Sequence, residues 1–570
     1  MTVQLEITPA LARENARWRA ERLATLPQRV RALVMEEVAR LDAVDYRAAN
    51  QRMGQLARDL ERAHVGRAYD EDEIRAFAES YARACSKMPM LTQREEFARS
   101  VGVEPPAARF LTDRYEGRAA RLADPQWWRR QLRKAWTRAA EDALRDLGIV
   151  RRGREPYASE DAVRYRAAQK RRASDFLHSC VAVNESDGTQ LQLWEVAQRS
   201  LANPALRRGE FMCRCRGFEQ IARDLGHVAL FCTLTAPSRF HPQLARGGRN
   251  PRYQRETVRA AQAWLRRMWA RARAKLHRLA VVWYGFRIAE PHHDGTPHWH
   301  LLIFAPQHAA EIIRIVLRAV WLSEYADEPG AAQHRCRFEW IDANKGSATG
   351  YVAKYVAKNL DGAGEIGEAE DLETGESVAS NIARVDAWAS LHGIRQFQQI
   401  GGPPVTLWRE ARRLRDSVAD ADIERARAAA DRGDWRAFCY AVGEGGQLLT
   451  RRTALKLHKE ETGELNKYGE CRGPRVLGLR YCSALVITRP NRWRIERKGQ
   501  VCENAAQHQA PQAEERRRRC VASVLPSLSS RVARSAARLG PVAITVRAAL
   551  AAGEPSTWTN PQESSRYGPH

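Results

Sequence analysis

The order of apolar runs between residues 226 and 359 constrains the fold more than any other feature of the sequence. The first run, HVALFCTLTAP (227–237), is rich in β-branched and aromatic residues and ends at a proline, as is typical of a buried strand. The pattern continues as an amphipathic helix (255–279), two strands (281–290 and 298–304), a helix (308–322), a strand (335–342) and a last helix (347–359). The segment PHHDGTP between the two adjacent strands predicts a turn that makes them a hairpin.

This β-α-β-β-α-β order predicts a ferredoxin-like, split βαβ domain, in which an antiparallel sheet carries its helices on one face. Apolar residues at three- and four-residue spacing predict helices over most of residues 10–224. The fold class is therefore α+β. We expect five parts: a mainly helical N-terminal region with DNA or partner contacts (1–224), the split βαβ domain with its extra helix (225–360), an acidic loop (361–385), an accessory DNA-binding region (386–500) and a largely disordered basic tail (501–570).

The charge of the chain indicates a polyanionic partner. Lys and Arg number 93 against 68 Asp and Glu, which leaves a net charge of +25 and favours nucleic acid or an anionic membrane surface. The sequence contains neither a long apolar segment nor a signal-peptide core, so we expect no membrane association. Eleven scattered cysteines suit a reducing cytoplasm, and the Cys213–Cys215 pair has no second pair at zinc-ribbon spacing.

Two histidines and a carboxylate form the strongest chemical pattern. His298 and His300 are two apart in a predicted strand and therefore share one face, whereas Trp299 points the other way. The hairpin brings Glu290 close to this pair. Such a set can bind a divalent cation and leave positions open for a phosphate oxygen. His292 and His293, in the turn, are alternative third ligands.

Paired tyrosines form a second pattern on the last predicted helix. Tyr351 and Tyr355 are four residues apart and share a helical face. Lys354 and Lys358 each follow a tyrosine by three residues. A phenol ionises near pH 10 in water, so nucleophilic attack at neutral pH needs help from a cation. Packing of both tyrosines in the core is the alternative interpretation.

Together, TLTAP, GFRIAEPHHDGTPHWHLLIF and GYVAKYVAKN resemble the bacteriophage replication gene A protein family, whose members are HUH endonucleases that initiate rolling-circle replication. The resemblance is densest over 226–360 and extends through GIRQFQQIGGPPV (393–405). It implies that His298, His300 and Glu290 bind Mg or Mn. It also implies that Tyr351 and Tyr355 are catalytic tyrosines assisted by Lys354 and Lys358.

The family resemblance implies a site- and strand-specific nuclease. One tyrosine would nick a phage origin through a 5′-phosphotyrosine intermediate and leave a 3′-OH that primes synthesis. The displaced strand would later be rejoined. The implied partners are single-stranded or supercoiled origin DNA and, because no P-loop is present, a host helicase and replisome in the bacterial cytoplasm. Trp283, Tyr284 and Phe286 are candidates for stacking on bases. The alternatives are an HUH transposase or relaxase, a non-catalytic DNA-binding protein, and a zinc hydrolase of small molecules.

Overall fold

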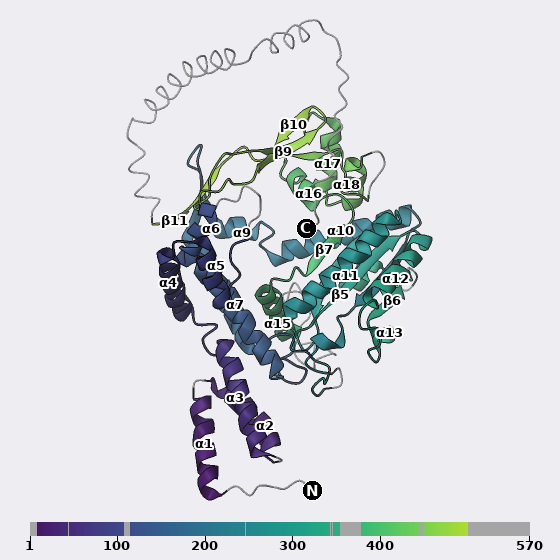
Figure 1. Ribbon diagram of the computed structural model, residues 1–570. Helices are drawn as coiled ribbons and strands as arrows, with labels where there is room; N and C mark the ends of the chain where they lie inside the picture. Colours follow the sequence, from purple (N-terminus) through teal and green to yellow (C-terminus); the bar gives the residue numbers. More distant parts are fainter. Residues whose placement is uncertain are drawn as a thin grey trace, which may run out of the picture. The chain divides into compact units, whose positions relative to one another are not determined.

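A computed structural model describes residues 8–24, 26–43, 45–107, 115–244, 247–342, 344, 346–353, 378–444 and 449–499 (Figure 1). Lys354, Tyr355 and Lys358, the acidic segment up to residue 377 and the tail from residue 500 lie outside these ranges. The chain divides into two compact units, Met1–Arg494 and Ile495–His570, and the contacts discussed below lie within the first.

Helices fill the N-terminal region, as the periodicity predicts. They are α1 (Pro9–Leu23), α2 (Gln28–Asp42), α3 (Tyr46–Arg62), α4 (Glu71–Lys87), α5 (Leu91–Ser100), α6 (Tyr115–Leu122) and α7 (Pro125–Asp146). The long helix α7 begins where Asp124 accepts a hydrogen bond from the amide of Gln126, with Pro125 in its first turn. Its apolar stripe, including Trp128 and Leu132, packs in one core with α2, α3 and α4.

The sequence predicts helices over most of residues 10–224, and the structure differs between residues 180 and 192. Between α8 (Glu160–Ser179) and α9 (Leu193–Gln198) the chain forms an antiparallel hairpin of β1 (Cys180–Asn184) and β2 (Gln190–Gln192). The short run CVAVN is β-branched and fully buried, so it pairs as a strand despite its helical neighbours. Helix α10 (Pro204–Asp224) then leads to the central sheet.

The central sheet contains the predicted order of elements. These are β3 (Val228–Leu234), α11 (Val258–Arg278), β4 (Tyr284–Pro291), β5 (Pro297–Ala305), α12 (Gln307–Trp321), the short α13 (Ala331–His334) and β6 (Cys336–Trp340). The strands lie in the order β6-β3-β5-β4-β7 and every neighbouring pair is antiparallel. The fifth strand, β7 (Phe397–Ile400), was not expected and pairs with the outer edge of β4.

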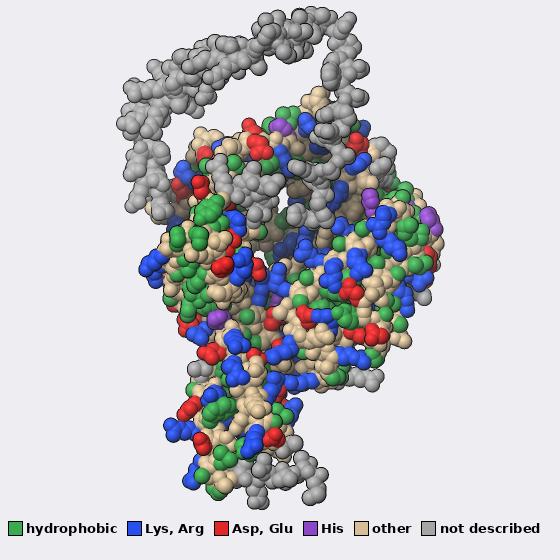
Figure 2. Space-filling view, in the orientation of Figure 1, with side chains coloured by type: hydrophobic (Ala, Val, Ile, Leu, Met, Phe, Trp, Pro, Cys, Tyr) green, Lys and Arg blue, Asp and Glu red, His purple; other side chains and the backbone are tan. Residues whose placement is uncertain are grey.

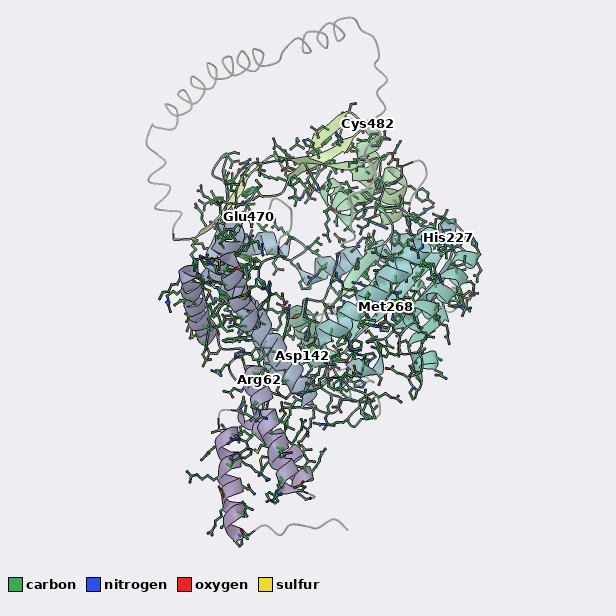
Figure 3. The ribbon with its side chains drawn as sticks, viewed as in Figure 1. Arg62, Asp142, His227, Met268, Glu470 and Cys482 are labelled. Carbon is green, nitrogen blue, oxygen red and sulfur yellow. The ribbon has the colours of Figure 1, made fainter. Side chains whose placement is uncertain are left out.

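Helices cover both faces of this sheet, whereas helices were expected on one face. Helices α11 and α12 lie over one face of the sheet (Figure 1). Alternation sends Leu230 and Trp299 into the core on this face, and Met268 of α11 lies in the same core (Figure 3). On the opposite face, Leu302 and Phe304 pack against α10. Tyr284 and Phe286 are fully buried in this second core, so they do not stack on bases.

The C-terminal part of the first unit combines short helices and strands: α15 (Val378–His392), α16 (Val405–Ala411), α17 (Ala421–Asp431), α18 (Trp435–Val442), β8 (Lys456–Glu460), β9 (Arg475–Tyr481) and β10 (Ala484–Ile487). The last strand, β11 (Trp493–Arg497), crosses the boundary to the second unit. Residues 378–385, expected in the acidic loop, form the first turns of α15. The α+β class is therefore confirmed. No helix among the described residues is long and apolar enough to cross a membrane.

Candidate metal and tyrosine site

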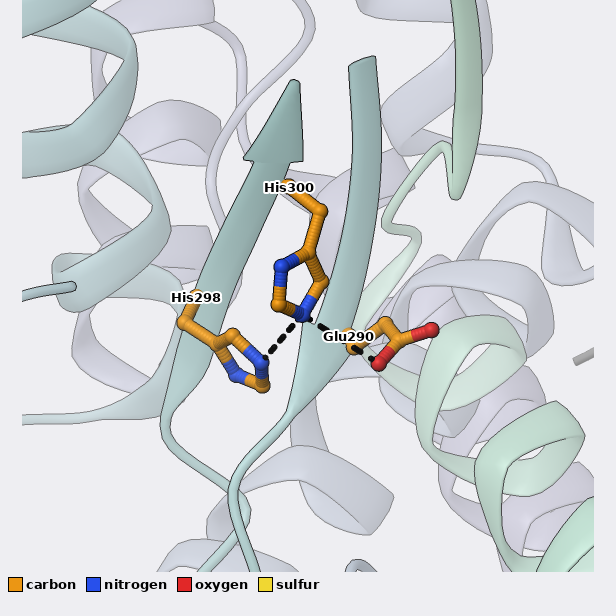
Figure 4. A group of neighbouring side chains, drawn as sticks. All are labelled: Glu290, His298 and His300. Atoms are coloured by element: carbon orange, nitrogen blue, oxygen red, sulfur yellow. Dashed lines mark hydrogen bonds and ion pairs between the residues drawn. The ribbon is translucent and has the colours of Figure 1, made fainter. Parts of the chain in front are cut away.

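The β4–β5 hairpin brings the carboxylate and the two histidines together. Glu290 lies directly opposite His298 in the antiparallel register, and His300 lies opposite Ile288. Because residues two apart in a strand share a face, both imidazoles leave β5 on the same side (Figure 4). Trp299 points to the other side, into the core with α11. The cross-strand position of Glu290 then places its carboxylate next to both rings.

The three side chains form a compact group of ligand atoms. Nε2 of His298 lies 2.9 Å from Nε2 of His300, and His300 Nε2 lies 3.6 Å from Oε2 of Glu290. One ligand atom from each residue falls within 4.8 Å of the others. Glu290 and His300 are each 6 % exposed. Two imidazoles and one carboxylate on a rigid hairpin are compatible with a divalent cation.

The neighbouring strand β3 orients His300. The hydroxyl of Thr233 lies 3.1 Å from His300 Nδ1, and the ring of Phe231 stacks on the imidazole with centroids 5.4 Å apart. A partner on Nδ1 turns Nε2 toward His298 and Glu290, which is the usual way a protein orients a ligating imidazole. Thr233 belongs to the run that predicts the first strand of the sheet, and its register with His300 is not readable from local pattern.

Tyr351 lies on the same side of the sheet as the ligand group. Its ring packs edge-on against Phe231, with centroids 4.7 Å apart, so Phe231 contacts both the tyrosine and His300. The phenol donates a hydrogen bond of 2.7 Å to Oε2 of Glu339 on β6. Burial and this carboxylate raise the pKa of Tyr351 to about 12, so the phenol is neutral near pH 7.

The helical segment that carries Tyr351 is anchored at its start by α10. The amides of Ala348 and Thr349 donate to the carboxylate of Glu219, at 3.2 and 3.1 Å. A carboxylate at the start of a helix satisfies the first free amides and complements the helix dipole. Val352, one residue after the tyrosine, is fully buried. These contacts fix the position of Tyr351 relative to the sheet.

The turn between β4 and β5 is built around Arg145 of α7. Its guanidinium donates to the carbonyl of Asp294 at 2.7 Å and to the hydroxyl of Thr296 at 2.8 Å. It also reaches the carbonyls of Glu256 and Phe240. Gly295 has a φ of +78°, a backbone conformation that strongly favours glycine. A residue 149 positions away in sequence therefore holds the turn that aligns the ligands.

The other two histidines of the turn do not join the ligand group. The ring of His292 lies 4.1 Å from that of His298, centroid to centroid, but the cluster of ligand atoms contains Glu290 instead. Nearby, His241 Nδ1 lies 2.9 Å from Oδ2 of Asp294. Burial opposes ionisation of Asp294, yet His241 and Arg145 outweigh it and hold the pKa of this carboxyl far below its usual range.

Comparison with known protein families finds a match to one of them. Residues 52–363 match the family described as bacteriophage replication gene A protein. The chain is 39 % identical over 398 residues to a "Replication protein" of Haemophilus phage HP1, and the alignment takes in 50 % of the length of that protein. It is 39 % identical over 414 residues to the "Replication gene A protein" of Escherichia phage 186, covered to 58 %.

A "Probable replication endonuclease from prophage-like region 1" of Salmonella typhi is 37 % identical over 415 residues and is covered to 50 %. Each of these three alignments takes in 69 % of this chain. The chain thus spans between one half and three fifths of the length of these relatives. No solved structure matches. The match over more than half of the sequence includes the histidine hairpin and Tyr351, and the chain belongs to the bacteriophage replication gene A protein family.

Proposed function

We propose that this protein is a metal-dependent DNA endonuclease that nicks a phage replication origin with a tyrosine nucleophile. The observation that carries the proposal is the pairing of a Glu–His–His group with Tyr351 on one face of the sheet, joined through Phe231. The β-α-β-β-α-β order, with β5 paired between β3 and β4, supports the ferredoxin-like HUH assignment. The relatives named as replication endonucleases support the nuclease activity.

The residues have distinct tasks in this proposal. Glu290, His298 and His300 would hold Mg or Mn, which when bound polarises a phosphate oxygen of the scissile bond. The oxygen of Tyr351 attacks phosphorus, the bond from phosphorus to the 3′ oxygen breaks, and the protein is left with a 5′-phosphotyrosine. The phenolic proton passes to Glu339, which accepts its hydrogen bond, and the 3′ oxygen takes a proton from solvent as it leaves, giving the 3′-hydroxyl that primes synthesis.

Strand transfer would follow from the same parts. The phosphotyrosine ester retains the energy of the cleaved phosphodiester, so a 3′-OH can displace the tyrosine and rejoin the strand without ATP. Tyr355, which lies outside the described residues, is proposed as the second nucleophile, with Lys354 and Lys358 stabilising charge on the phosphate. Origin DNA is the proposed substrate, and a host helicase would separate the strands.

A nicking assay on supercoiled and single-stranded origin DNA tests the proposal. Wild type would be compared with Tyr351→Phe, Tyr355→Phe, the double variant and His298→Ala, with Mg or Mn and with EDTA. We expect a covalent protein–DNA adduct that disappears in the double variant, in His298→Ala and in EDTA. DNA binding without any adduct in wild type would instead identify a non-catalytic DNA-binding protein. Adducts formed on transposon ends or a plasmid transfer origin, and not on phage DNA, would favour the transposase or relaxase alternative.

A further inference from the structure

Helix α11 carries a row of arginines along its length. The helix lies on the side of the sheet opposite the ligand group. Arg259, Arg266 and Arg273 are seven residues apart and all exposed. Seven residues are close to two helical turns, so the three side chains share one side of the helix at intervals of about 10 Å. Lys and Arg side chains gather on the surface occupied by α11 (Figure 2).

Beneath this row lies Arg287, a strand residue that is only 6 % exposed. Its guanidinium carbon is 4.1 Å from the ring centroid of Trp299. That tryptophan in turn contacts Trp269 of α11, edge to face with centroids 6.2 Å apart. Since Trp269 lies between Arg266 and Arg273 on the helix, the buried guanidinium and the exposed row belong to one site.

These arginines lack carboxylate partners among the described residues. Nε of Arg287 is buried without a hydrogen-bond partner there. By contrast, Arg267 and Arg271 on the same helix both pair with Glu324, each at 3.0 Å. Burial and the charges of Arg395, Arg266 and Arg273 lower the pKa of Arg287 to about 10. Holding a buried cation next to other cations is costly unless an anion compensates it.

We propose that Arg266, Arg273 and Arg287 bind phosphate groups of the DNA backbone and form a second DNA-contact surface, on the face of the sheet away from the metal site. Guanidinium groups suit this task because their planar fork matches phosphate oxygens. Trp283, half-buried and edge-on to Trp269 at 5.3 Å, lies beside the row and offers a ring to an adjacent base. The inference rests on the proposed function only in taking DNA as the ligand.

The test compares two double variants of the full-length protein that remove equal charge from one helix. Arg266→Gln/Arg273→Gln removes the two arginines of the row that belong to the proposed site, and Arg267→Gln/Arg271→Gln removes the two that pair with Glu324. Binding of a fluorescent single-stranded oligonucleotide would be measured by anisotropy at several KCl concentrations. We expect weaker binding by the first variant alone, with the slope of log affinity against log salt reduced by about 1.4 for two lost contacts.

The remaining arms separate the possible explanations. Equal weakening by both double variants would overturn the proposal, since it would show a general charge effect. Arg287→Lys keeps the charge but loses the fork, and unchanged binding by this folded variant would remove Arg287 from the site. A saturable change in tryptophan fluorescence with inorganic phosphate, with no difference in oligonucleotide binding, would assign the site to free phosphate. None of these readouts needs nicking, so a wild type that binds DNA without cleaving it would refute the proposed function and leave this test intact.

Discussion

At the scale of single residues, the environment of Tyr351 sets a condition on its chemistry. The raised pKa of Tyr351 keeps the phenol protonated near neutral pH, and Glu339, which accepts its hydrogen bond, is a potential proton acceptor. An acceptor at 2.7 Å is within the range required of a general base. The same carboxylate therefore disfavours the free phenolate at rest and, in the proposed reaction, would take the phenolic proton during attack.

We expect Glu339→Gln to lower the single-turnover nicking rate by about 100-fold, the usual contribution of a general base. Both proteins should also carry Tyr355→Phe, so that only Tyr351 reacts. Without the acceptor the rate should rise with pH by about tenfold per unit, because attack then requires prior ionisation of the phenol. Glu311→Gln, on α12 and ion-paired with Arg314, is the control. A wild-type rate with an unchanged pH profile in Glu339→Gln would exclude a role for this carboxylate.

At the scale of secondary-structure elements, helix α7 holds the hairpin that carries the ligands. Arg145 is 1 % exposed, and three of its four acceptors are main-chain carbonyls of residues 240, 256 and 294. Trp388 of α15 adds a hydrogen bond of 2.8 Å to the carbonyl of Gly295. Buried carbonyls without a donor destabilise a fold, so these two side chains determine the shape of the turn.

We expect Arg145→Met to lower the free energy of unfolding by about 2–4 kcal/mol, because it leaves several buried acceptors unsatisfied. Mn²⁺ affinity, measured by calorimetry on the folded fraction, should fall as the hairpin loses its alignment. Lys134→Met, an exposed position on the same helix, should change neither quantity. Normal stability together with normal Mn²⁺ affinity in Arg145→Met would show that the turn holds its shape without this side chain.

At the scale of the whole molecule, ion pairs tie the N-terminal helices to one another. Glu71 at the start of α4 accepts hydrogen bonds from Arg129 and Arg133 of α7 and from Tyr165 of α8. Burial opposes ionisation of Glu71, but the bonds from Arg133 and Arg129 outweigh it and lower the pKa to about 2. One carboxylate thereby connects three helices.

The sign of this shift makes Glu71 a source of acid sensitivity. A depressed carboxyl pKa adds stability above the unfolded value, and that stability is lost as the pH falls from about 4.5 to about 2. We expect Glu71→Gln to lose about 2 kcal/mol at pH 7, less than the full pKa shift would give because solvent screens this partly exposed carboxylate, and to unfold with a flatter pH dependence in this range. Glu79→Gln, exposed on the same helix, should match wild type in urea unfolding from pH 7 to pH 2. Parallel curves for wild type and Glu71→Gln would contradict the assignment.

The sequence by itself determined the α+β class, the order of the central strands and helices, and the face shared by His298 and His300. Each of these follows from local periodicity, since alternation in a strand and spacing in a helix depend only on near neighbours. Glu290 was predicted for the same reason, because a short turn fixes the register of a hairpin. The family was also readable, from motifs that are contiguous in the chain.

Only the tertiary structure decided which distant residues serve the site. Thr233 meets His300 across 67 positions, and Arg145 reaches the turn across 149. The addition of β7 to the sheet, the burial of Tyr284 and Phe286 and the cover provided by α10 likewise depend on packing between elements. Local sequence patterns do not determine the register between strands that are far apart in the chain. They also do not distinguish a buried arginine from an exposed one. The partners of such residues, and therefore their roles, are fixed only by the packing of distant elements in the folded protein.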